Sequence, residues 1–305
     1  MLKAASPLYI QRLTEVVNES YKIGRVPESI LVGKMTLIDK KEPSLEVGKK
    51  RPITVSSVLL SVFTKILHKR MDSICEKQKF YGPIQYGFRS KRSTVDCVFL
   101  IVSALKAAKR KNQPISLAFC DIAKAYDSVC RELLYTKLRS IGFGGRVVAL
   151  IRSVYYNDCL QVNLARGLTE LLYSTQGVKQ GCSLSPMLFA LYIASLGQQL
   201  QNLKLGVALG GVIVTALFFA DDLLLLSRTP KMGMNRLLKT SAGFCRDVHM
   251  NLSASKTFIL SNARYAVSWK VEDSTIEEIL VAKYLGVNLQ VRGRSMLGVY
   301  EEDMI

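Results

Sequence analysis

The spacing of hydrophobic positions divides the chain into helical and extended segments. Apolar residues that recur every three or four positions indicate amphipathic helices, and the segments with this spacing are 8–22, 55–79, 94–110, 131–141, 145–156, 185–200 and 234–249. Short continuous apolar runs indicate buried strands, and they occur at 115–120, 206–209, 212–219, 256–260 and 283–289. Strands and helices alternate after residue 114, which predicts an α/β or α+β sheet covered by helices. Gly210-Gly211 predicts a hairpin turn between two of these strands.

Two adjacent aspartates, Asp221 and Asp222, interrupt an apolar part of the chain. No charge occurs in residues 205–220, and four leucines follow the pair. If the chain reverses near the acids, both carboxylates lie at the tip of a hairpin; without a reversal, strand alternation would point them to opposite faces. Adjacent acids usually lie in a solvated loop. Here the hydrophobic flanks favour metal binding instead, because buried carboxylates are costly unless a cation compensates them.

A third acid, Asp121, follows the strand predicted at 115–120. Phosphoryl transfer of the polymerase type uses two divalent ions roughly 3.5–4 Å apart, and oxygen ligands suit magnesium. We therefore expect Asp121, Asp221 and Asp222 to hold two Mg²⁺ ions. Asp127 is interpreted instead as a residue at the start of a helix, since Ser128 and a helical run follow it.

The composition indicates a protein with a substantial core and a polyanionic partner. The chain has 305 residues, of which 49% are hydrophobic, enough for one large domain or two smaller ones. Its net charge is +18, and residues 1–113 hold 22 Lys and Arg against 9 Asp and Glu. This basic first part fits a nucleic acid partner. A charge excess that only aids solubility is the alternative.

Other classes of site fit the sequence poorly. Seven scattered cysteines without a C-x-x-C pair argue against a disulfide framework or a zinc site, and His68 and His249 are too far apart in sequence to suggest a histidine-based site. The start of the chain lacks the apolar core of a signal peptide. Residues 205–220 are too few to span a bilayer. We therefore expect an intracellular protein of the cytoplasm or nucleus, without a membrane partner.

Several segments resemble, in order and spacing, the motifs of reverse transcriptases from non-long-terminal-repeat (LINE-type) retrotransposons. The palm motifs are resembled by Phe119–Val129, Gly177–Phe189 and Phe219–Asp222. The fingers motifs are resembled by Arg51–Val55 and Gln85–Arg89, and the motifs that close the palm by Ser255–Thr257 and Lys283–Gly286. One such motif alone is weak, whereas several in order are a specific signal. The match covers roughly residues 20–290.

The resemblance implies an α+β right-hand fold with fingers and palm, in which an antiparallel palm sheet packs on helices. A helical lead-in would occupy residues 1–19, the fingers about 20–113 and the palm about 114–290. Residues 291–305 would begin a thumb that is largely missing. The implied activity is RNA-directed DNA synthesis with two Mg²⁺ ions, with an RNA template, a DNA primer and deoxynucleoside triphosphates as partners. The oligomeric state is left open.

The resemblance also assigns roles to site residues. Asp121, Asp221 and Asp222 fall on the family's metal-ligand positions. Tyr126 falls where an aromatic ring lies under the sugar and blocks a 2′-hydroxyl, the group that separates RNA from DNA substrates; ordinary core packing is the alternative. Lys256 falls on the position proposed to protonate the departing pyrophosphate, and a surface lysine is the alternative.

Further residues are expected to contact nucleotide or template. At Gln180-Gly181 the backbone would approach the incoming nucleotide or template base closely, which a residue without a Cβ permits; a simple turn is compatible with this role. Arg89 is expected to clamp the triphosphate, because a guanidinium matches phosphate oxygens with two donors. Arg51 and Lys40 are weaker candidates, for which a solvated face or a contact with the template backbone is an equal alternative.

The sequence departs from the family's pattern at two positions. Ser253 occupies a slot where the family usually has Asn, and Asp39 one where it usually has Pro. Two rival functions remain open: an RNA-dependent RNA polymerase, and a truncated copy that only binds RNA. Ala220 and Tyr126 argue against the first, and the three aspartates argue against decay of the site.

Overall fold

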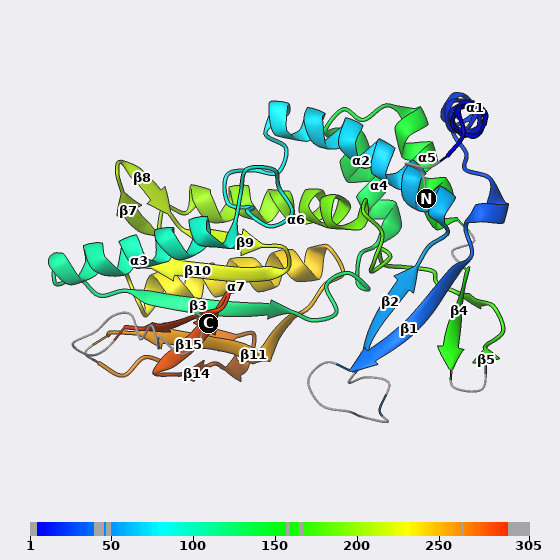
Figure 1. Cartoon of the computed structure of the whole chain (residues 1–305). Helices are drawn as coiled ribbons and strands as arrows, with labels where there is room; N and C mark the ends of the chain where they lie inside the picture. Colours follow the sequence, from blue (N-terminus) through cyan, green and yellow to red (C-terminus); the bar gives the residue numbers. More distant parts are fainter. Residues whose placement is uncertain are drawn as a thin grey trace. The chain divides into compact units, whose positions relative to one another are not determined.

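The computed structural model describes residues 5–39, 46, 50–156, 159–164, 167–263 and 265–291 (Figure 1). Lys40 and the predicted tail after residue 291 therefore lie outside the described residues. The chain divides into two compact units that interleave in sequence. Met1–Gln78 and Val129–Tyr192 form the first unit, and Lys79–Ser128 and Ile193–Ile305 form the second.

The first unit combines helices with a small mixed sheet. Its helices are α1 (Pro7–Ile23), the 3₁₀-helix η2 (Glu28–Ile30), α2 (Val58–Gln78), α4 (Arg131–Ser140), α5 (Gly145–Tyr155) and the start of α6 (Ser185–Asn202). Its strands are β1 (Gly33–Asp39), β2 (Lys50–Val55), β4 (Cys159–Leu164), β5 (Gly167–Leu168) and β6 (Leu172–Tyr173), in the order β2-β1-β4-β5 with β6 also paired to β4. β1 runs antiparallel to β2 and parallel to β4.

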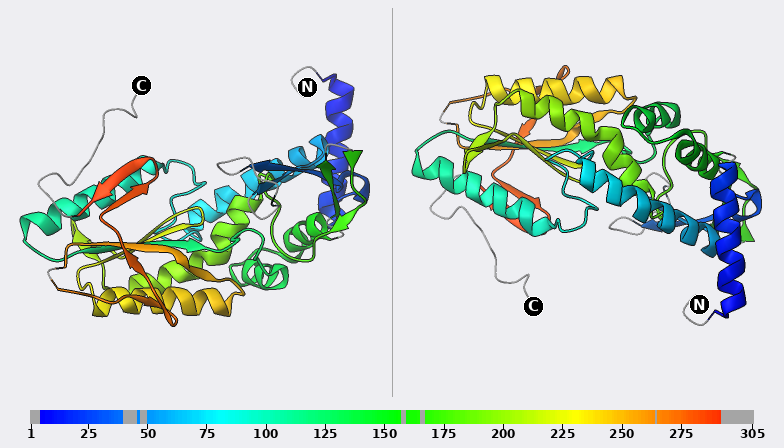
Figure 2. Two further views of the ribbon diagram at one scale, coloured as in Figure 1. Left: turned by 90° about the horizontal axis from the view of Figure 1, so that it is seen from below. Right: turned by 90° about the horizontal axis from the view of Figure 1, so that it is seen from above.

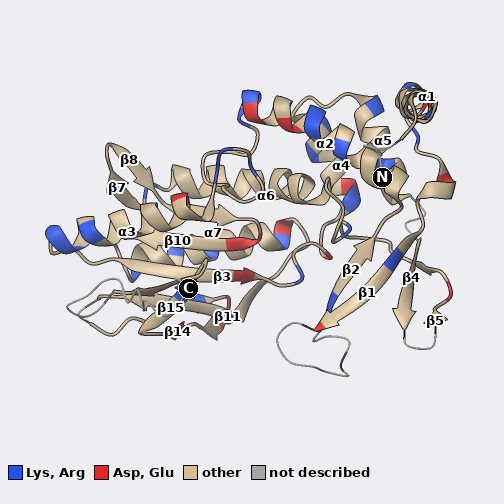
Figure 3. Ribbon diagram, in the orientation of Figure 1, with Lys and Arg blue, Asp and Glu red and all other residues tan. Residues whose placement is uncertain are grey.

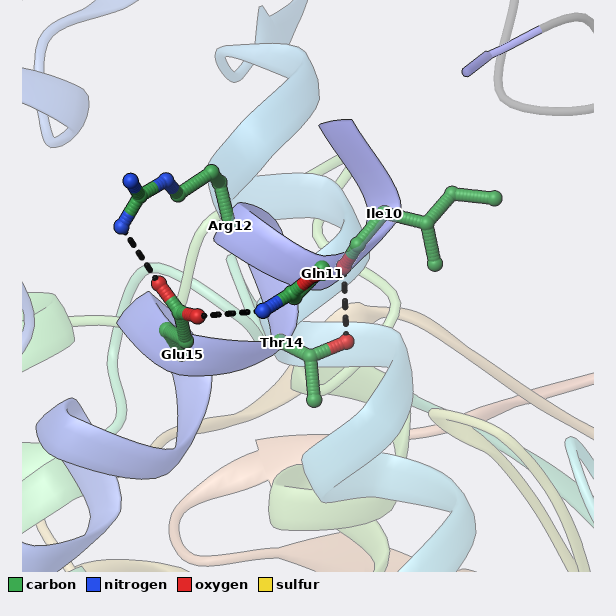
Figure 4. A network of polar contacts seen from close by, with 5 residues as sticks. All are labelled: Ile10, Gln11, Arg12, Thr14 and Glu15. Atoms are coloured by element: carbon green, nitrogen blue, oxygen red, sulfur yellow. Dashed lines mark hydrogen bonds and ion pairs between the residues drawn. The ribbon is translucent and has the colours of Figure 1, made fainter. Parts of the chain in front are cut away.

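Local signals define α1. Ser6 accepts a hydrogen bond from the Tyr9 backbone N–H, Pro7 occupies the first turn, and Gly24 ends the helix with a φ of +72°, as expected for caps and helix starts of this kind. Exposed side chains three or four positions apart pair along it: Arg12 with Glu15 at 3.0 Å and Gln11 with Glu15 at 3.1 Å (Figure 4). These pairs support the helix only modestly.

The second unit contains a five-stranded sheet and the helices that pack with it. The helices are α3 (Thr94–Arg110), α7 (Met232–Asp247) and the end of α6. The sheet consists of β3 (Ser116–Ile122), β9 (Ala216–Phe219), β10 (Asp222–Ser227), β11 (Leu252–Ser261) and β14 (Glu277–Glu278), in the order β14-β11-β3-β10-β9. Three hairpins complete the unit: β7 (Val207–Leu209) with β8 (Val212–Val214), β12 (Lys270–Val271) with β13 (Ser274–Thr275), and β15 (Val281–Tyr284) with β16 (Val287–Gln290).

The sheet of the second unit is antiparallel over its four longer strands, with only the short β14 running parallel to β11. Helices α3 and α7 lie on opposite faces of it (Figure 2). Leu117 and Phe119 belong to the apolar cluster that includes α3. Burial raises the pKa of the alternate residue Cys120, and the neighbouring Cys245 of α7 adds to the increase. The period of two along β3 therefore separates an α3 face from an α7 face.

A capping box marks the start of α3 and basic residues mark its end. The Asp96 carboxylate accepts a hydrogen bond from the Ser93 backbone N–H at 2.8 Å, which fixes the start of the helix. The last turn carries Lys109 and Arg110, visible as a basic helix end in Figure 3, where positive charge is favourable.

Most of the expected elements are confirmed. All seven helices form within a few residues of the predicted ranges, and Gly210-Gly211 is a hairpin turn. The expected strand at 283–289 is wrong: it is the hairpin β15–β16, since Leu285 and Gly286 both adopt positive φ. The strand expected over 212–219 breaks at Thr215 into β8 and β9.

The helix start expected at Asp127 is wrong. The helix begins at Arg131 with Cys130 as its N-cap, and Asp127 lies in the turn after β3. The strands of the first unit were not anticipated, because their burial is one-sided and β2 mixes charged residues with Pro52. In the described part of the chain, no helix is long and apolar enough to cross a membrane.

Candidate active site

The two adjacent aspartates lie at the tip of a hairpin, as expected. β9 and β10 pair in antiparallel fashion from Asp222 and Phe219 onward, so Ala220 and Asp221 form a two-residue turn. Ala220 has a φ of +60°, which is uncommon for a residue other than glycine. The chain reversal therefore separates the two acids: Asp222 opens the strand, and Asp221 belongs to the turn.

Asp121 lies beside Asp222 on the neighbouring strand. β3 pairs with β10 through Cys120 and Leu223, and the next position in this register places Asp121 beside Asp222. Phe119 on β3 and Leu224 on β10 face α3. Asp121 and Asp222 lie two positions from these residues along their strands, so both project from the same α3 face of the sheet. The acidic segments at the end of β3 and the start of β10 lie side by side in Figure 3.

A cavity of about 200 Å³ opens on this face. Its lining residues are Phe119, Cys120, Asp121, Asp222, Leu223, Lys256, Phe258, Lys283, Tyr284 and Leu285. The aromatic rings of Phe119 and Phe258 stack with centroids 5.1 Å apart and form an apolar floor. The structure thus brings together Asp121, Asp222 and Lys256, three of the four residues predicted to act on the substrate or its metal.

Lys256 reaches the acids from an irregularity in β11. The register between β11 and β3 shifts between Ser253 and Phe258, so Lys256 lies in a bulge of the kind that redirects a side chain. Its Nζ is 3.4 Å from Oδ2 of Asp121. The basic group predicted beside the metal ligands therefore contacts one of them.

The carboxylates destabilise one another's charge. Burial, together with the neighbouring charges of Asp221 and Asp121, raises the pKa of Asp222 to about 6. Such a cluster of like charges favours a compensating cation.

The residues present fit a divalent cation, although not as a closed ligand cage. Oδ2 of Asp121 is buried and accepts no hydrogen bond. The Lys256 ammonium lies 3.4 Å from this oxygen, so its charge has a cationic neighbour while its lone pairs remain available to a metal. Within the described ranges, however, no three His, Cys, Asp or Glu side chains converge closely enough to hold a metal ion by themselves. Mg²⁺ keeps several waters and needs only one or two protein carboxylates, so Asp121 and Asp222 suffice as its anchors. Asp221 does not line the cavity.

Tyr126 lies in the turn that follows β3. Burial raises the pKa of its phenol, and the charge of Asp221 adds to the increase. The tyrosine is therefore close enough to the Asp221 turn to sense its carboxylate. It is half-buried rather than part of the fully buried core.

Arg89 has a structural role within its own loop. Its Nη1 donates to the backbone oxygens of Gly82 at 3.1 Å and Gln85 at 2.9 Å, and its guanidinium lies 5.1 Å from the centroid of the Tyr81 ring. These contacts hold the loop from residue 81 to 89 together. The role predicted for Arg89 as a triphosphate clamp stays a prediction.

Gln180 and Gly181 lie in the first unit, where they contact β2. The Thr54 backbone N–H donates to the backbone oxygen of Gln180 at 2.9 Å. Gly181 has a φ of +108°, and a Cβ there would lie 2.4 Å from the Thr54 oxygen. The glycine is thus required by a close backbone approach. The approach seen in the structure is to β2, whereas the predicted approach to a nucleotide or template base stays a prediction. Arg51, on the same strand, is exposed.

Two residues of the sites were not nominated from the sequence. Lys283 lines the cavity with the acids. It is the first residue of the motif Lys283–Gly286, and this position could have identified it as a candidate. Arg131 is buried and donates to four backbone oxygens around the segment that precedes Gln180: those of Tyr155, Ser174, Gln176 and Gly177. Backbone acceptors leave no pattern in a sequence, so the sequence could not predict these contacts of Arg131.

Comparisons with known proteins agree with this geometry. A family profile described as "Reverse transcriptase (RNA-dependent DNA polymerase)" matches residues 38–298. The Retrovirus-related Pol polyprotein from type-2 retrotransposable element R2DM of Drosophila melanogaster is 29% identical over 294 residues, covering 92% of this chain and 27% of that protein. A polyprotein from type-1 retrotransposable element R2 of Bradysia coprophila is 30% identical over 301 residues, covering 92% and 33%. The chain thus spans about a quarter to a third of these relatives.

Solved structures share the fold. An apo telomerase from Candida tropicalis truncated from its C-terminal domain superposes with a TM-score of 0.62 at 13% identity, covering 91% of this chain and 57% of the other. The predicted α+β fold of polymerase fingers and palm is confirmed by this likeness and by the sheet and helices described above.

Proposed function

Because the chain belongs to the reverse transcriptase (RNA-dependent DNA polymerase) family, we propose that it copies an RNA template into DNA by extending a primer 3′-hydroxyl with deoxynucleoside triphosphates. The identification of a LINE-type domain is confirmed by relatives from R2 and jockey elements. One observation carries the proposal: Asp121 and Asp222 project side by side into one cavity, where Oδ2 of Asp121 accepts no hydrogen bond and lies 3.4 Å from the Lys256 ammonium.

In the proposed reaction, Asp121 and Asp222 anchor two Mg²⁺ ions, with Asp221 as a further carboxylate on the adjacent turn. Bound magnesium would lower the pKa of the attacking hydroxyl and neutralise charge on the phosphates. The carboxylates orient the reacting groups, and the apolar floor of Phe119 and Phe258 restricts water on one side of the cavity.

Lys256 is the proposed general acid. Its Nζ carries a proton next to Asp121, and in the reaction it donates that proton to an oxygen of the departing pyrophosphate. The contact with Asp121 supports this role, since it places the Lys256 ammonium in the lining of the cavity. Lys283, also in the lining, adds positive charge for a phosphodiester.

The remaining site residues bind substrate in this proposal. Tyr126 acts as the gate against a 2′-hydroxyl; its partial exposure and its proximity to the Asp221 charge support this role. Gln180 and Gly181 are proposed to contact the nucleotide or template base. Arg89 is proposed to contact the triphosphate, Arg51 the template backbone, and the weaker candidate Lys40 remains a prediction.

The proposed partners are an RNA template, a DNA primer and deoxynucleoside triphosphates, in the cytoplasm or nucleus. The excess of Lys and Arg in residues 1–113 supports a polyanionic partner. A structural neighbour, the telomerase from Candida tropicalis, was solved with a fragment of telomeric RNA, at a TM-score of 0.61 and 13% identity.

Primer extension on an RNA template with Mg²⁺ tests the proposal. Deoxynucleotide incorporation that Asp121→Asn abolishes supports it, with the exposed Asp273→Asn as a matched control. Preferential incorporation of ribonucleotides would instead indicate an RNA-dependent RNA polymerase. Binding of the duplex without extension would indicate a copy that only binds RNA, and either result overturns the proposal.

A further inference from the structure

A short extended segment lies along the outer edge of β9. The Phe218 N–H donates to the Ile84 oxygen at 2.7 Å, and the Tyr86 N–H donates to the Phe218 oxygen at 2.8 Å. Gln85 and Phe218 form a parallel bridge. Residues 84–86 therefore extend the sheet by one strand-like step, directly beside the hairpin that carries Asp221 and Asp222.

The side chain of Gln85 binds the turn itself. It is 2% exposed. Its Oε1 accepts hydrogen bonds from the Ala220 N–H at 3.2 Å and from the Gly87 N–H at 2.9 Å, and its Nε2 donates to the Ala220 oxygen at 3.3 Å. Both backbone polar groups of Ala220 are thus paired with one buried amide, 135 positions away in the sequence.

Ala220 is the residue that most needs such support. Its φ of +60° is a left-handed conformation that a residue with a Cβ adopts at a cost, and it immediately precedes Asp221. A strained backbone conformation persists when its surroundings over-determine it. The two-way contact with Gln85 supplies that constraint from outside the hairpin.

Gly87 brings the segment close enough for this contact. A Cβ at position 87 would lie 2.1 Å from the Ala220 nitrogen and 2.9 Å from the Phe219 carbonyl carbon. The backbone of Gly87 therefore packs directly against the turn, and a side chain there would displace it.

From this arrangement we propose that Gln85 is a positioning residue for the acidic site. Its amide fixes Ala220 and thereby the placement of Asp221 and Asp222 relative to Asp121. This role rests on the proposed function, because it matters for chemistry only if the three acids act on a bound cation. Gln85 itself touches neither the cation nor the substrate.

Two variants separate positioning from general stability. Gln85→Met keeps the length of the side chain but removes all three hydrogen bonds. Gln85→Glu keeps the acceptors for the Ala220 and Gly87 N–H groups and, when ionised, loses the donor to the Ala220 oxygen. Gln201→Met is the matched control, since it removes a hydrogen bond from Nε2 to the Ile213 oxygen in the same unit, away from the acids.

The first readout is hydrogen–deuterium exchange of the peptide 217–223, measured without metal. Gln85→Met is expected to increase exchange there at least tenfold, Gln85→Glu by a smaller factor, and Gln201→Met not at all. The second is Mn²⁺ binding followed by electron paramagnetic resonance, where Gln85→Met should weaken binding at least fivefold. The third is the Mg²⁺ concentration for half-maximal primer extension, which should rise by a similar factor while the KM for primer stays constant.

Unchanged exchange and unchanged Mn²⁺ affinity in a folded Gln85→Met variant would overturn the proposal, as would equal changes in Gln201→Met. If Gln85→Met does not fold, Gln85→Glu decides, with at least a twofold change in both readouts expected. If the unaltered chain binds Mn²⁺ but extends no primer, the proposed function fails while the exchange and binding data still test the role of Gln85.

Discussion

Single carboxylates define the chemistry of the acidic site. Asp121 and Asp222 are adjacent across two strands, and the pKa of Asp222 is raised to about 6 by burial and by its acidic neighbours. The protein therefore keeps a locally unfavourable charge arrangement in the absence of a cation. At a site of this kind, a mutation that removes a charge is expected to increase stability and to reduce function.

Asp222→Asn should separate stability from cation binding. Removing the charge relieves repulsion with Asp121 and Asp221, so the free energy of unfolding without metal should stay equal or increase by up to about 1 kcal/mol. The increase in melting temperature that Mg²⁺ gives the unaltered chain should disappear. Thermal unfolding with and without Mg²⁺ measures both effects. A variant that melts earlier yet keeps its response to Mg²⁺ would contradict this account.

Tyr126→Ala should relax selection against ribonucleotides. Tyr126 is half-buried and the Asp221 charge contributes to its raised pKa, and in the proposed role removal of its ring opens space for a 2′-hydroxyl. The ratio of kcat/KM for deoxy- over ribonucleotides should fall by roughly tenfold or more, whereas Tyr126→Phe, which keeps the ring, should retain it. Unchanged selectivity in the alanine variant would remove the gate assignment.

At the scale of elements, close backbone approaches hold loops to strands. In the first unit, Gly181 meets Thr54 of β2 where a Cβ would clash. In the second, the segment at Gly87 meets the β9–β10 turn in the same way. In both places a glycine allows a loop to hydrogen-bond a strand end, so the loop that carries a site residue is fixed by main-chain contacts.

Gly181→Ala should destabilise the first unit more than the same substitution does at a glycine with a similar φ. Its φ is +108° and the added Cβ would lie 2.4 Å from the Thr54 oxygen, so a loss of about 3 kcal/mol is expected from strain and overlap together. Gly142→Ala is the matched control: its φ is +97°, but nothing lies within 4 Å of the added Cβ, so only about 1 kcal/mol should be lost. Urea unfolding measures both, and equal losses would show that the overlap is relieved cheaply.

Arg131 should be a major stabilising residue of the segment before Gln180. All five guanidinium N–H groups are used, with Nε on the Gly177 oxygen, two bonds from Nη1, and two from Nη2. Arg131→Met should cost about 3 kcal/mol, because it leaves buried carbonyls unpaired, and Arg131→Lys should recover part of the loss. Arg12→Met, which breaks an exposed pair with Glu15, should cost about 0.5 kcal/mol or less. Similar losses for the two arginines in denaturant unfolding would argue against this role of Arg131.

At the scale of the whole molecule, local patterns were sufficient for the helices and for the acidic hairpin. The sequence allowed a chain reversal at Asp221 and Asp222 that would place both acids at a hairpin tip, and the structure has this reversal. The same patterns could not separate the roles of the two acids, because the turn residue Ala220 with its positive φ has no sequence signature. They also missed β1 and β2, whose burial alternates but whose exposed positions include apolar residues such as Ile53 and Val55.

Long-range contacts account for the rest of what the sequence did not predict. Gln85 binds Ala220 across 135 positions and Arg131 binds carbonyls up to 46 positions away. Both use backbone partners, which every residue offers equally. The resemblance to reverse transcriptase motifs identified the family correctly, but only the structure assigned internal contacts to Arg89 and Gly181.

The central claim is that Asp121 and Asp222 share a bound divalent cation. A crystal structure of the chain with Mn²⁺, a primer annealed to an RNA template and a non-hydrolysable deoxynucleoside triphosphate tests it most directly. The account predicts anomalous density within about 2.2 Å of a carboxylate oxygen of both residues, next to the triphosphate. A triphosphate bound elsewhere, or metal density that contacts neither carboxylate, would contradict it.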